Sequence, residues 1–130
     1  MPSVAWQRLG RYLRETQLLG SIQSTLYWDQ NTRMPQAGAP WRGDQLALLA
    51  RELHSRQSSN DFSDLIEDAK EEYLKQRNEG ELSSLEDLQR ARNLKLLEQD
   101  INRQKKLDAQ LVSELAHAKA KGYSTWYQAK

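Results

Sequence analysis

The sequence predicts an all-α fold, with helical hairpins followed by a long C-terminal helix. Three observations predict it. Apolar residues recur at three- and four-residue spacing along nearly the whole chain. No window alternates apolar and polar residues for long, so strand signals are almost absent. Proline and glycine number only three and six among the 130 residues, and Pro35, Gly38 and Pro40 fall together in one expected loop. We treat residues 1–130 as one helical segment.

The first helical stripe begins at Val4 and reaches Tyr27, interrupted at Gly20. A glycine inside a helix either bends it or is tolerated at a cost of about 1 kcal/mol against alanine. A loop is expected next, because Pro35 and Pro40 disfavour helix in the residues that precede them. The sequence therefore predicts a helical region, then a loop over 35–40.

A third helix is predicted after the loop, followed by a helical hairpin that consists of the fourth helix and the long last helix. The third starts near Pro40, since proline is tolerated in a first helical turn, and the polar run from Ser58 ends it. The fourth carries an apolar stripe from Phe62 to Leu74 and stops near Gly80.

The last element is predicted to be the longest. Ser83 and Glu86 match a capping box, and Glu86 stands four residues before Arg90. No proline or glycine follows before Gly122. An unbroken helix there would have about 40 residues and be about 60 Å long. A compact domain of this size has a diameter of only about 36 Å, so the helix either kinks or packs against additional protein.

A further helix is expected to begin at Trp126, with Ser124 or Thr125 as its cap. An end at Lys130 leaves Trp126 and Tyr127 at a frayed terminus, which is a poor use of large aromatic side chains. We therefore expect the chain to be a truncated part of a longer protein.

Composition excludes several classes of function. With 19 Lys and Arg against 18 Asp and Glu, the net charge of +1 gives no cation excess for nucleic acid or an anionic membrane. There is no cysteine, so no disulfide, thiolate ligand or cysteine nucleophile is expected. No secretory signal or membrane-spanning run is visible. A cytoplasmic location is the prediction.

The densest motif lies between Leu26 and His54. It consists of Trp28, Asp29, Thr32, Met34, Pro35, Gly38, Arg42, Gln45 and His54. This pattern resembles the M32 (carboxypeptidase Taq-like) zinc metallocarboxypeptidases. They show a Trp-Asp pair ending one helix, a Met-Pro loop with a glycine, then Arg, Gln and His along the next helix. Trp126 and Ala129 resemble the start of that family's next signature.

The resemblance implies a longer, mostly helical enzyme that removes C-terminal residues from peptides with zinc or cobalt. Its zinc site is built around His-Glu-x-x-His, in which two histidines share one helical face. This chain has only His54 and His117 and lacks that motif, so it carries no catalytic or metal residue and no cofactor of its own. The resemblance implies a wall or lid of the substrate groove that is inactive alone. Its expected partners are the rest of the carboxypeptidase chain and a peptide, with a homodimer as a further option.

Most motif residues also have a purely structural interpretation. We expect Asp29 to pair with Arg42, because a guanidinium readily pins a loop against a helix. Met34 and its neighbours are expected to shape the turn. His54 is expected to be a buried, hydrogen-bonded residue, and His117 a solvated or ion-paired one. The four tryptophans are expected to pack rather than to stack on nucleic acid.

Two other functions compete with this interpretation. One is a stand-alone helical protein-interaction module that binds or dimerises through its long helix. Gln104 and Asp108 interrupt the apolar seam, which argues against a long coiled coil. The other is a regulatory remnant that caps a full-length homologue.

Overall fold

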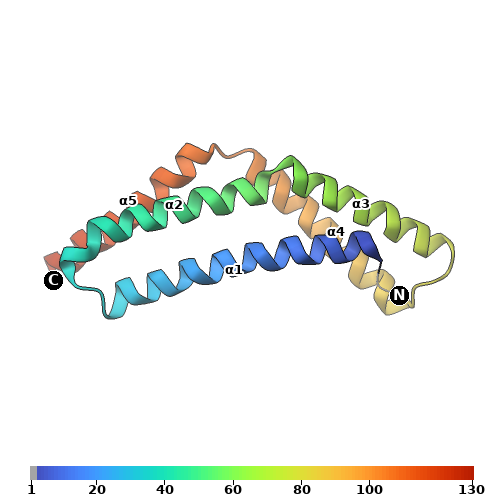
Figure 1. The fold of residues 1–130 in the computed structure, drawn as a ribbon, viewed down its shortest axis with the longest axis horizontal. Helices are drawn as coiled ribbons and strands as arrows, with labels where there is room; N and C mark the ends of the chain where they lie inside the picture. The colour runs from blue at the N-terminus through green and yellow to red at the C-terminus, as the bar shows by residue number, and fades with distance from the viewer. Residues whose placement is uncertain (1–2) are drawn as a thin grey trace. The chain divides into compact units, whose positions relative to one another are not determined.

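A computed structural model describes residues 3–130, and the part it describes contains helices and no strand. Figure 1 shows the order of the elements along the chain. The helices are α1 (Val4–Thr32), the 3-10 helix η1 (Gln36–Gly38), α2 (Ala39–Ser58), α3 (Asn60–Asn78), α4 (Ser84–Lys105) and α5 (Ala109–Ala129). The predicted all-α fold class is confirmed.

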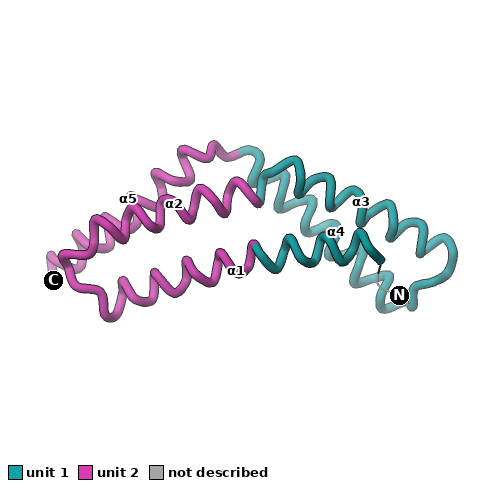
Figure 2. Tube along the Cα trace, viewed as in Figure 1, with its two compact units in different colours: residues 1–15, 57–106 teal, residues 16–56, 107–130 magenta. Residues whose placement is uncertain are grey.

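The chain divides into two compact units (Figure 2). Unit 1 comprises residues 1–15 and 57–106, and unit 2 comprises residues 16–56 and 107–130. Helix α1 contributes its first part to unit 1 and its second part to unit 2. It runs through Gly20 without interruption, so this glycine is tolerated in the helix and does not end it.

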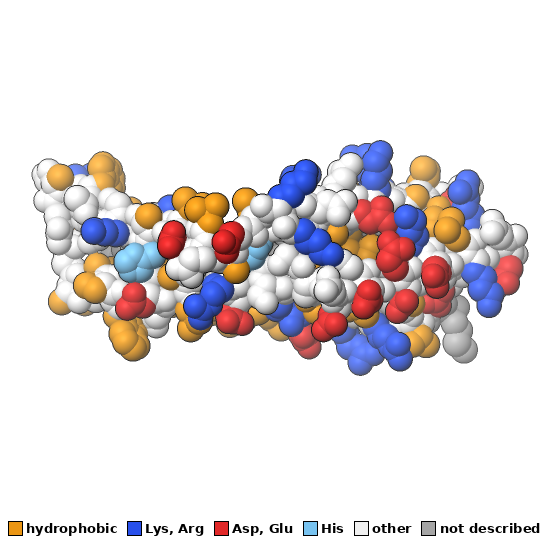
Figure 3. Space-filling view, turned by 90° about the horizontal axis from the view of Figure 1, so that it is seen from above, with side chains coloured by type: hydrophobic (Ala, Val, Ile, Leu, Met, Phe, Trp, Pro, Cys, Tyr) orange, Lys and Arg blue, Asp and Glu red, His pale blue; other side chains and the backbone are white. Residues whose placement is uncertain are grey.

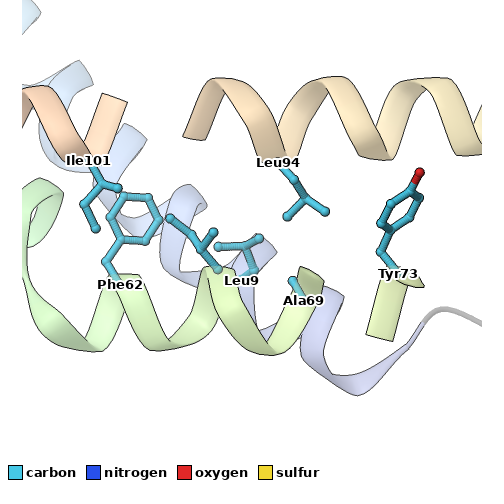
Figure 4. Packing of buried hydrophobic residues seen from close by; sticks show 7 residues of the cluster. Leu9, Phe62, Ala69, Tyr73, Leu94 and Ile101 are labelled. Atoms are coloured by element: carbon cyan, nitrogen blue, oxygen red, sulfur yellow. The ribbon is translucent and has the colours of Figure 1, made fainter. Parts of the chain in front are cut away.

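Unit 1 has an apolar core built by α1, α3 and α4. Its buried members are Leu9, Phe62, Ile66, Ala69, Tyr73, Leu94 and Ile101. The four α3 residues among them follow helical spacing and form one face, as the sequence predicted. Figure 4 shows Leu94 and Ile101 of α4 directed toward the α3 residues of this core. The rings of Tyr12 and Phe62 stack with centroids 5.1 Å apart, which ties α1 to the same core.

The unit 1 helices are capped at Gly80 and Ser83, as the sequence predicted, and also at Ser59, which was expected only within the polar run that ends the third helix. Ser59 Oγ accepts a hydrogen bond from the Phe62 amide at 3.0 Å, so the polar run after α2 starts α3. Helix α3 ends at a Schellman motif in which Gly80 has φ of 71° and the Glu81 amide donates to the Gln76 carbonyl. The capping hydroxyl predicted at the start of α4 is also present, in Ser83.

Unit 2 packs the second part of α1 against α2 and α5. Leu46 is fully buried in it, with Ala50 and Leu53 on the same face of α2. On α5 the buried residues are Ala116 and Ala120. Small residues at these positions let two helix backbones approach each other closely.

The prediction of one unbroken helix from Ser83 is wrong, because residues 106–108 separate α4 from α5. Asp108 caps α5 by accepting a hydrogen bond from the Gln110 amide at 2.8 Å. The Leu107 carbonyl bonds to the His54 ring nitrogen at 2.9 Å instead of continuing a helical ladder. A local cap and a tertiary hydrogen bond thus break a segment that no proline or glycine interrupts.

The prediction of a separate helix from Trp126 is also wrong, because α5 continues through Gly122 to Ala129. Thr125 lies inside this helix, and its hydroxyl donates to the Lys121 carbonyl at 3.0 Å. A hydroxyl that bonds to a carbonyl one turn earlier serves no capping role. Ser124 and Thr125 are therefore interior residues of α5.

Large apolar side chains are exposed in both units. Those at least two-fifths exposed include Val4, Leu18, Ile22, Leu48, Leu74, Leu85, Leu88, Leu96, Leu107, Leu111 and Leu115. On the face shown in Figure 3, positive and negative side chains are interspersed. No helix among residues 3–130 is long and apolar enough to span a lipid bilayer.

Candidate functional site

The motif residues gather in unit 2, around the turn from α1 to α2. Arg42 is the centre of this arrangement and is only 13% exposed. Its guanidinium donates from Nη2 to Asp29 Oδ2 at 2.9 Å and from Nη1 to the Leu26 carbonyl at 2.7 Å. Its Nε donates to Gln45 Oε1 at 2.9 Å. The Asp29–Arg42 pair expected from the sequence is present, and it joins the end of α1 to the start of α2.

The turn itself is held by backbone hydrogen bonds. The Asp29 carbonyl accepts from the amides of Arg33 and Met34, both at 2.9 Å. Thr32 Oγ1 donates to the Trp28 carbonyl at 2.6 Å, so its hydroxyl is used within α1. These contacts fix where the chain leaves the helix. Thr32 and Met34 thus lie where a turn-shaping role requires them.

The second part of the turn contains η1. Pro35 precedes it with φ of −63° and ψ of 146°, and the Pro35 carbonyl accepts from the Gly38 amide at 2.9 Å. A Cβ added at Gly38 would lie 3.4 Å from the Met34 side chain, in ordinary van der Waals contact. Gln36 Oε1 accepts hydrogen bonds from Ser124 and Gln128 of α5. The turn is thereby fastened to α5 as well as to α2.

The two histidines have the structural settings that the sequence predicted. His54 is 4% exposed and satisfied by the Leu107 carbonyl. His117 Nε2 lies 3.4 Å from Asp44 Oδ1, so it forms the expected ion pair when protonated.

The tryptophans depart from their expected packing role. Trp28, Trp41 and Trp126 are 58%, 72% and 55% exposed. Only Trp6 packs against a core, in unit 1, where the Arg90 guanidinium lies 5.2 Å from its ring centroid. Periodicity places an aromatic residue on a helix but does not say whether another element covers it.

Sequence reasoning missed Gln30, which is 5% exposed in unit 2. Its Nε2 donates to the Ala120 carbonyl at 3.3 Å and so links α1 to α5. One signal could have found it: Gln30 follows Leu26 by four residues and continues the apolar stripe of α1.

Unit 2 is hollowed on two sides of α5. The larger hollow, about 480 Å³, lies between the start of α2 and α5, with Gly43, Asp44, His117 and Lys121 in its wall. On the other side, two smaller hollows lie between α1 and α5 and share Gln30, Asn31 and Tyr123.

The sequence pattern described as Carboxypeptidase Taq (M32) metallopeptidase matches residues 8–130. The chain belongs to the M32 family. It is also 32% identical, over 129 residues, to a protein of Thermus thermophilus named thermostable carboxypeptidase 1. That match includes 99% of this chain and 24% of the relative, so the chain spans about a quarter of the relative's length. No solved structure matches it.

The M32 assignment raises the question of a metal site in this chain. Among residues 3–130, no three side chains of His, Cys, Asp or Glu lie close enough together to hold a metal ion. The His117–Asp44 pair offers two donors, whereas a protein zinc site uses three or four. Residues 3–130 therefore do not fit the metal that the M32 family uses. Its helices contribute a positioned turn and surfaces, with no metal-binding centre among them.

Proposed function

We propose that residues 1–130 form the N-terminal helical segment of a metallocarboxypeptidase and supply structure rather than catalytic groups. One observation carries this proposal. Nearly all of this chain, 99%, matches a named carboxypeptidase, yet the match takes up only 24% of that relative. About three quarters of the relative's length is therefore available for the catalytic centre. The single-segment organisation and the N-terminal position come from the motif order of the family.

The surface of the chain supports a role as wall or lid of a substrate groove. Exposed leucines, such as Leu85, Leu88 and Leu115, offer apolar area that a larger body would cover. The Arg42 contacts hold the turn between α1 and α2 in one geometry, which suits a wall that must keep its shape. The parent reaction would be removal of C-terminal residues from peptides.

Metal chemistry in such an enzyme would come from residues outside this chain, with zinc or cobalt as the expected ion. The cytoplasm stays the predicted location, because a cysteine-free sequence suits a reducing compartment. A homodimer also stays a prediction, which analytical ultracentrifugation of the chain tests directly.

Complementation tests the proposal. The Thermus thermophilus relative would be prepared without the part that this chain matches, and residues 1–130 would be added back in the presence of zinc or cobalt. Release of the C-terminal residue from an N-acylated dipeptide is the measurement. We expect no turnover by either part alone, turnover by the mixture, and loss of that turnover with a chelator.

Two outcomes contradict the proposal. One is metal-dependent turnover by residues 1–130 alone, which would place catalytic groups in this chain. The other is an inactive mixture at saturating chain when the intact relative is active in the same assay. The DNA after the Lys130 codon discriminates further. An open frame leading to His-Glu-x-x-His favours the enzyme segment, and a stop codon favours a stand-alone interaction module.

A further inference from the structure

Helix α5, which lies entirely in the magenta unit of Figure 2, is apolar on two sides. Its inner side carries Ala116 and Ala120, which are buried in unit 2. Its outer side carries Leu111, Leu115 and Trp126, which are 45%, 53% and 55% exposed. A helix that is apolar all round is normally buried all round. Unit 2 therefore covers only one side of α5.

The outer side of α5 forms one regular row of residues. It consists of Leu111, Leu115, Ala118, Gly122 and Trp126, which follow one another at three- or four-residue spacing. This spacing places them along one face of the helix, as in the apolar seam of two packed helices. All five residues are exposed, and none of them is charged. We call these five residues the α5 stripe.

Packing within residues 3–130 does not require the glycine of the stripe. A Cβ added at Gly122 would meet none of their atoms within 4 Å. A glycine in the interior of a helix is also less stable than alanine. Gly122 and Ala118 make the middle of the stripe lower than its ends at Leu115 and Trp126. Such a row fits a helix whose largest side chain lies opposite Gly122.

The charges of α5 narrow the chemistry of what could cover the stripe. The charged residues of this helix are Glu114, Lys119 and Lys121, and they lie outside the stripe. One acidic and two basic residues give α5 too small a cation excess to attract an anionic membrane. The centres of protein interfaces are also depleted of charged residues. The stripe therefore suits another helix with an uncharged, apolar face.

The size of the stripe distinguishes two possible occupants. From Leu111 to Trp126 it is about 22 Å long, and a helix is about 10 Å wide, so the contact covers roughly 220 Å² of each partner. A stable complex of separate chains buries about 800 Å² per partner. A second copy would therefore bind weakly through the stripe alone. A helix of the same polypeptide needs less area, because tethering raises its effective concentration to the millimolar range.

We propose that the α5 stripe is covered by one helix from the remainder of the parent carboxypeptidase chain. This helix presents an uncharged, apolar face and places its largest side chain opposite Gly122. The Thermus thermophilus relative has the length for such a helix, because the match takes up only 24% of it. This inference rests on the proposed function, because it takes the rest of the enzyme to be the partner.

Thiol protection tests whether the stripe is covered. Residues 1–130 replace the matching part of the Thermus thermophilus relative in a chimera, which is compared with the chain alone. Leu115→Cys lies in the stripe, and Leu48→Cys on α2 is the matched control, since the two leucines are 53% and 50% exposed. Alkylation of each thiol by iodoacetamide is followed by peptide mass spectrometry.

We expect alkylation of the Leu115→Cys thiol to be at least about tenfold slower in the chimera than in the chain alone, as for a contact that is open less than a tenth of the time. The rate for the Leu48→Cys thiol should change less than about twofold, because that leucine lies outside the stripe. The chain has no cysteine of its own, so each thiol reports on one position of residues 1–130.

The glycine of the stripe provides a second measurement that does not need the chimera. Gly122→Leu should raise the concentration of chain that gives half-maximal complementation about tenfold or more, because it overfills the contact. Gly122→Ala should raise it less. Ser55→Leu, at an exposed position of α2, is the control and should leave it unchanged. The two Gly122 variants should melt no lower than the parent chain, since a Cβ there meets open space.

Three results would overturn the inference. They are an unchanged alkylation rate for Leu115→Cys in the chimera, equal slowing of both thiols, and slowing in the chain alone as its concentration rises, which would identify a second copy as the occupant. Failure of the inference is distinguishable from failure of the proposed function. An active mixture with an unprotected stripe removes the inference and keeps the proposed function. A protected stripe in the chimera with an inactive mixture does the reverse.

Discussion

Several buried polar side chains of this protein stabilise it by hydrogen bonds that link different helices. Each of the three guanidinium nitrogens of Arg42 donates a hydrogen bond to a residue of α1 or α2. A ring nitrogen of His54 is hydrogen-bonded to the carbonyl of Leu107, which lies between α4 and α5. Gln30 links α1 to α5 through its hydrogen bond to the Ala120 carbonyl. Removing a buried polar side chain lowers the free energy of unfolding, because its hydrogen-bond partner is left buried without a partner.

Arg42→Met should lower the free energy of unfolding by about 2 kcal/mol, because it leaves the Leu26 carbonyl and the Asp29 carboxylate without their charged donor. Urea denaturation followed by circular dichroism measures the change. Arg51→Met, at an exposed position of the same helix, is the control and should stay within about 0.5 kcal/mol of the parent chain. Equal effects of the two substitutions would mean that the Arg42 contacts do not hold the turn.

Tyr73 gives a pH-dependent prediction. Its hydroxyl donates to Asp87, and this hydrogen bond, together with burial, raises the pKa of Tyr73 above the usual value of 10.0. A raised tyrosine pKa favours the neutral form in the folded chain. This contribution to stability is therefore present below the unfolded pKa of about 10 and is lost as the pH rises through the folded pKa.

Absorbance at 295 nm should show a late tyrosine ionisation step, above the usual pKa of 10.0, that belongs to Tyr73. Tyr73→Phe should remove that late step, and it should reduce the loss of urea stability between pH 9 and pH 11, values that lie about one unit either side of the unfolded pKa. If the late step persists in this variant, the assignment to Tyr73 is wrong.

At the scale of elements, caps and glycines decide where the helices end. Gly20 and Gly122 lie inside helices, whereas Gly80 ends one, and the difference is backbone conformation. Gly80 has φ of 71°, which an L side chain adopts at a cost. A Cβ at Gly20 meets no atom within 4 Å.

Gly20→Ala should therefore stabilise the chain by up to about 1 kcal/mol, and Gly80→Ala should destabilise it by about 1 kcal/mol. Thermal unfolding of the two variants against the parent chain is the measurement. The opposite signs are the essential point, since the substitution is the same at both positions. Two changes of the same sign would contradict the left-handed cap at the end of α3.

The break between α4 and α5 can be tested at its cap. Asp108→Ala removes the acceptor for the Gln110 amide and should cost about 1 kcal/mol of stability. Asp108→Asn keeps an acceptor and should recover most of that loss. Differential scanning calorimetry of both variants is the measurement. A fully stable alanine variant would show that the His54–Leu107 hydrogen bond alone breaks the helix.

For the whole molecule, the exposed leucines are side chains whose contribution to binding can be measured apart from their contribution to stability. Leu85 and Leu88 are 64% and 69% exposed, whereas Leu46 is fully buried. A side chain that is already in water contributes little to the stability of this chain. The same side chain can still contribute to binding a larger body.

The double substitution Leu85→Gln with Leu88→Gln should change the free energy of unfolding by less than about 0.5 kcal/mol per site. It should also weaken complementation of the shortened relative, so more chain is needed for the same turnover. Leu46→Ala is the contrasting variant and should cost about 2–5 kcal/mol. Undiminished complementation by the double variant would remove these leucines from the proposed contact surface.

The sequence by itself determined the helical class, the cap at Ser83, the end of the fourth helix near Gly80, and the Asp29–Arg42 pair. These features depend on spacing and on side chains close in the sequence, which a periodic pattern records. It also determined the family, through the motif between Leu26 and His54.

Only the tertiary structure decided where the last helical region breaks, which tryptophans are exposed, and that Gln30 is buried and bonded to Ala120. Each of these depends on a partner far away in the chain: Leu107 meets His54, and Gln30 meets Ala120. Contacts over such sequence separations arise from packing of whole helices, and no local propensity encodes them.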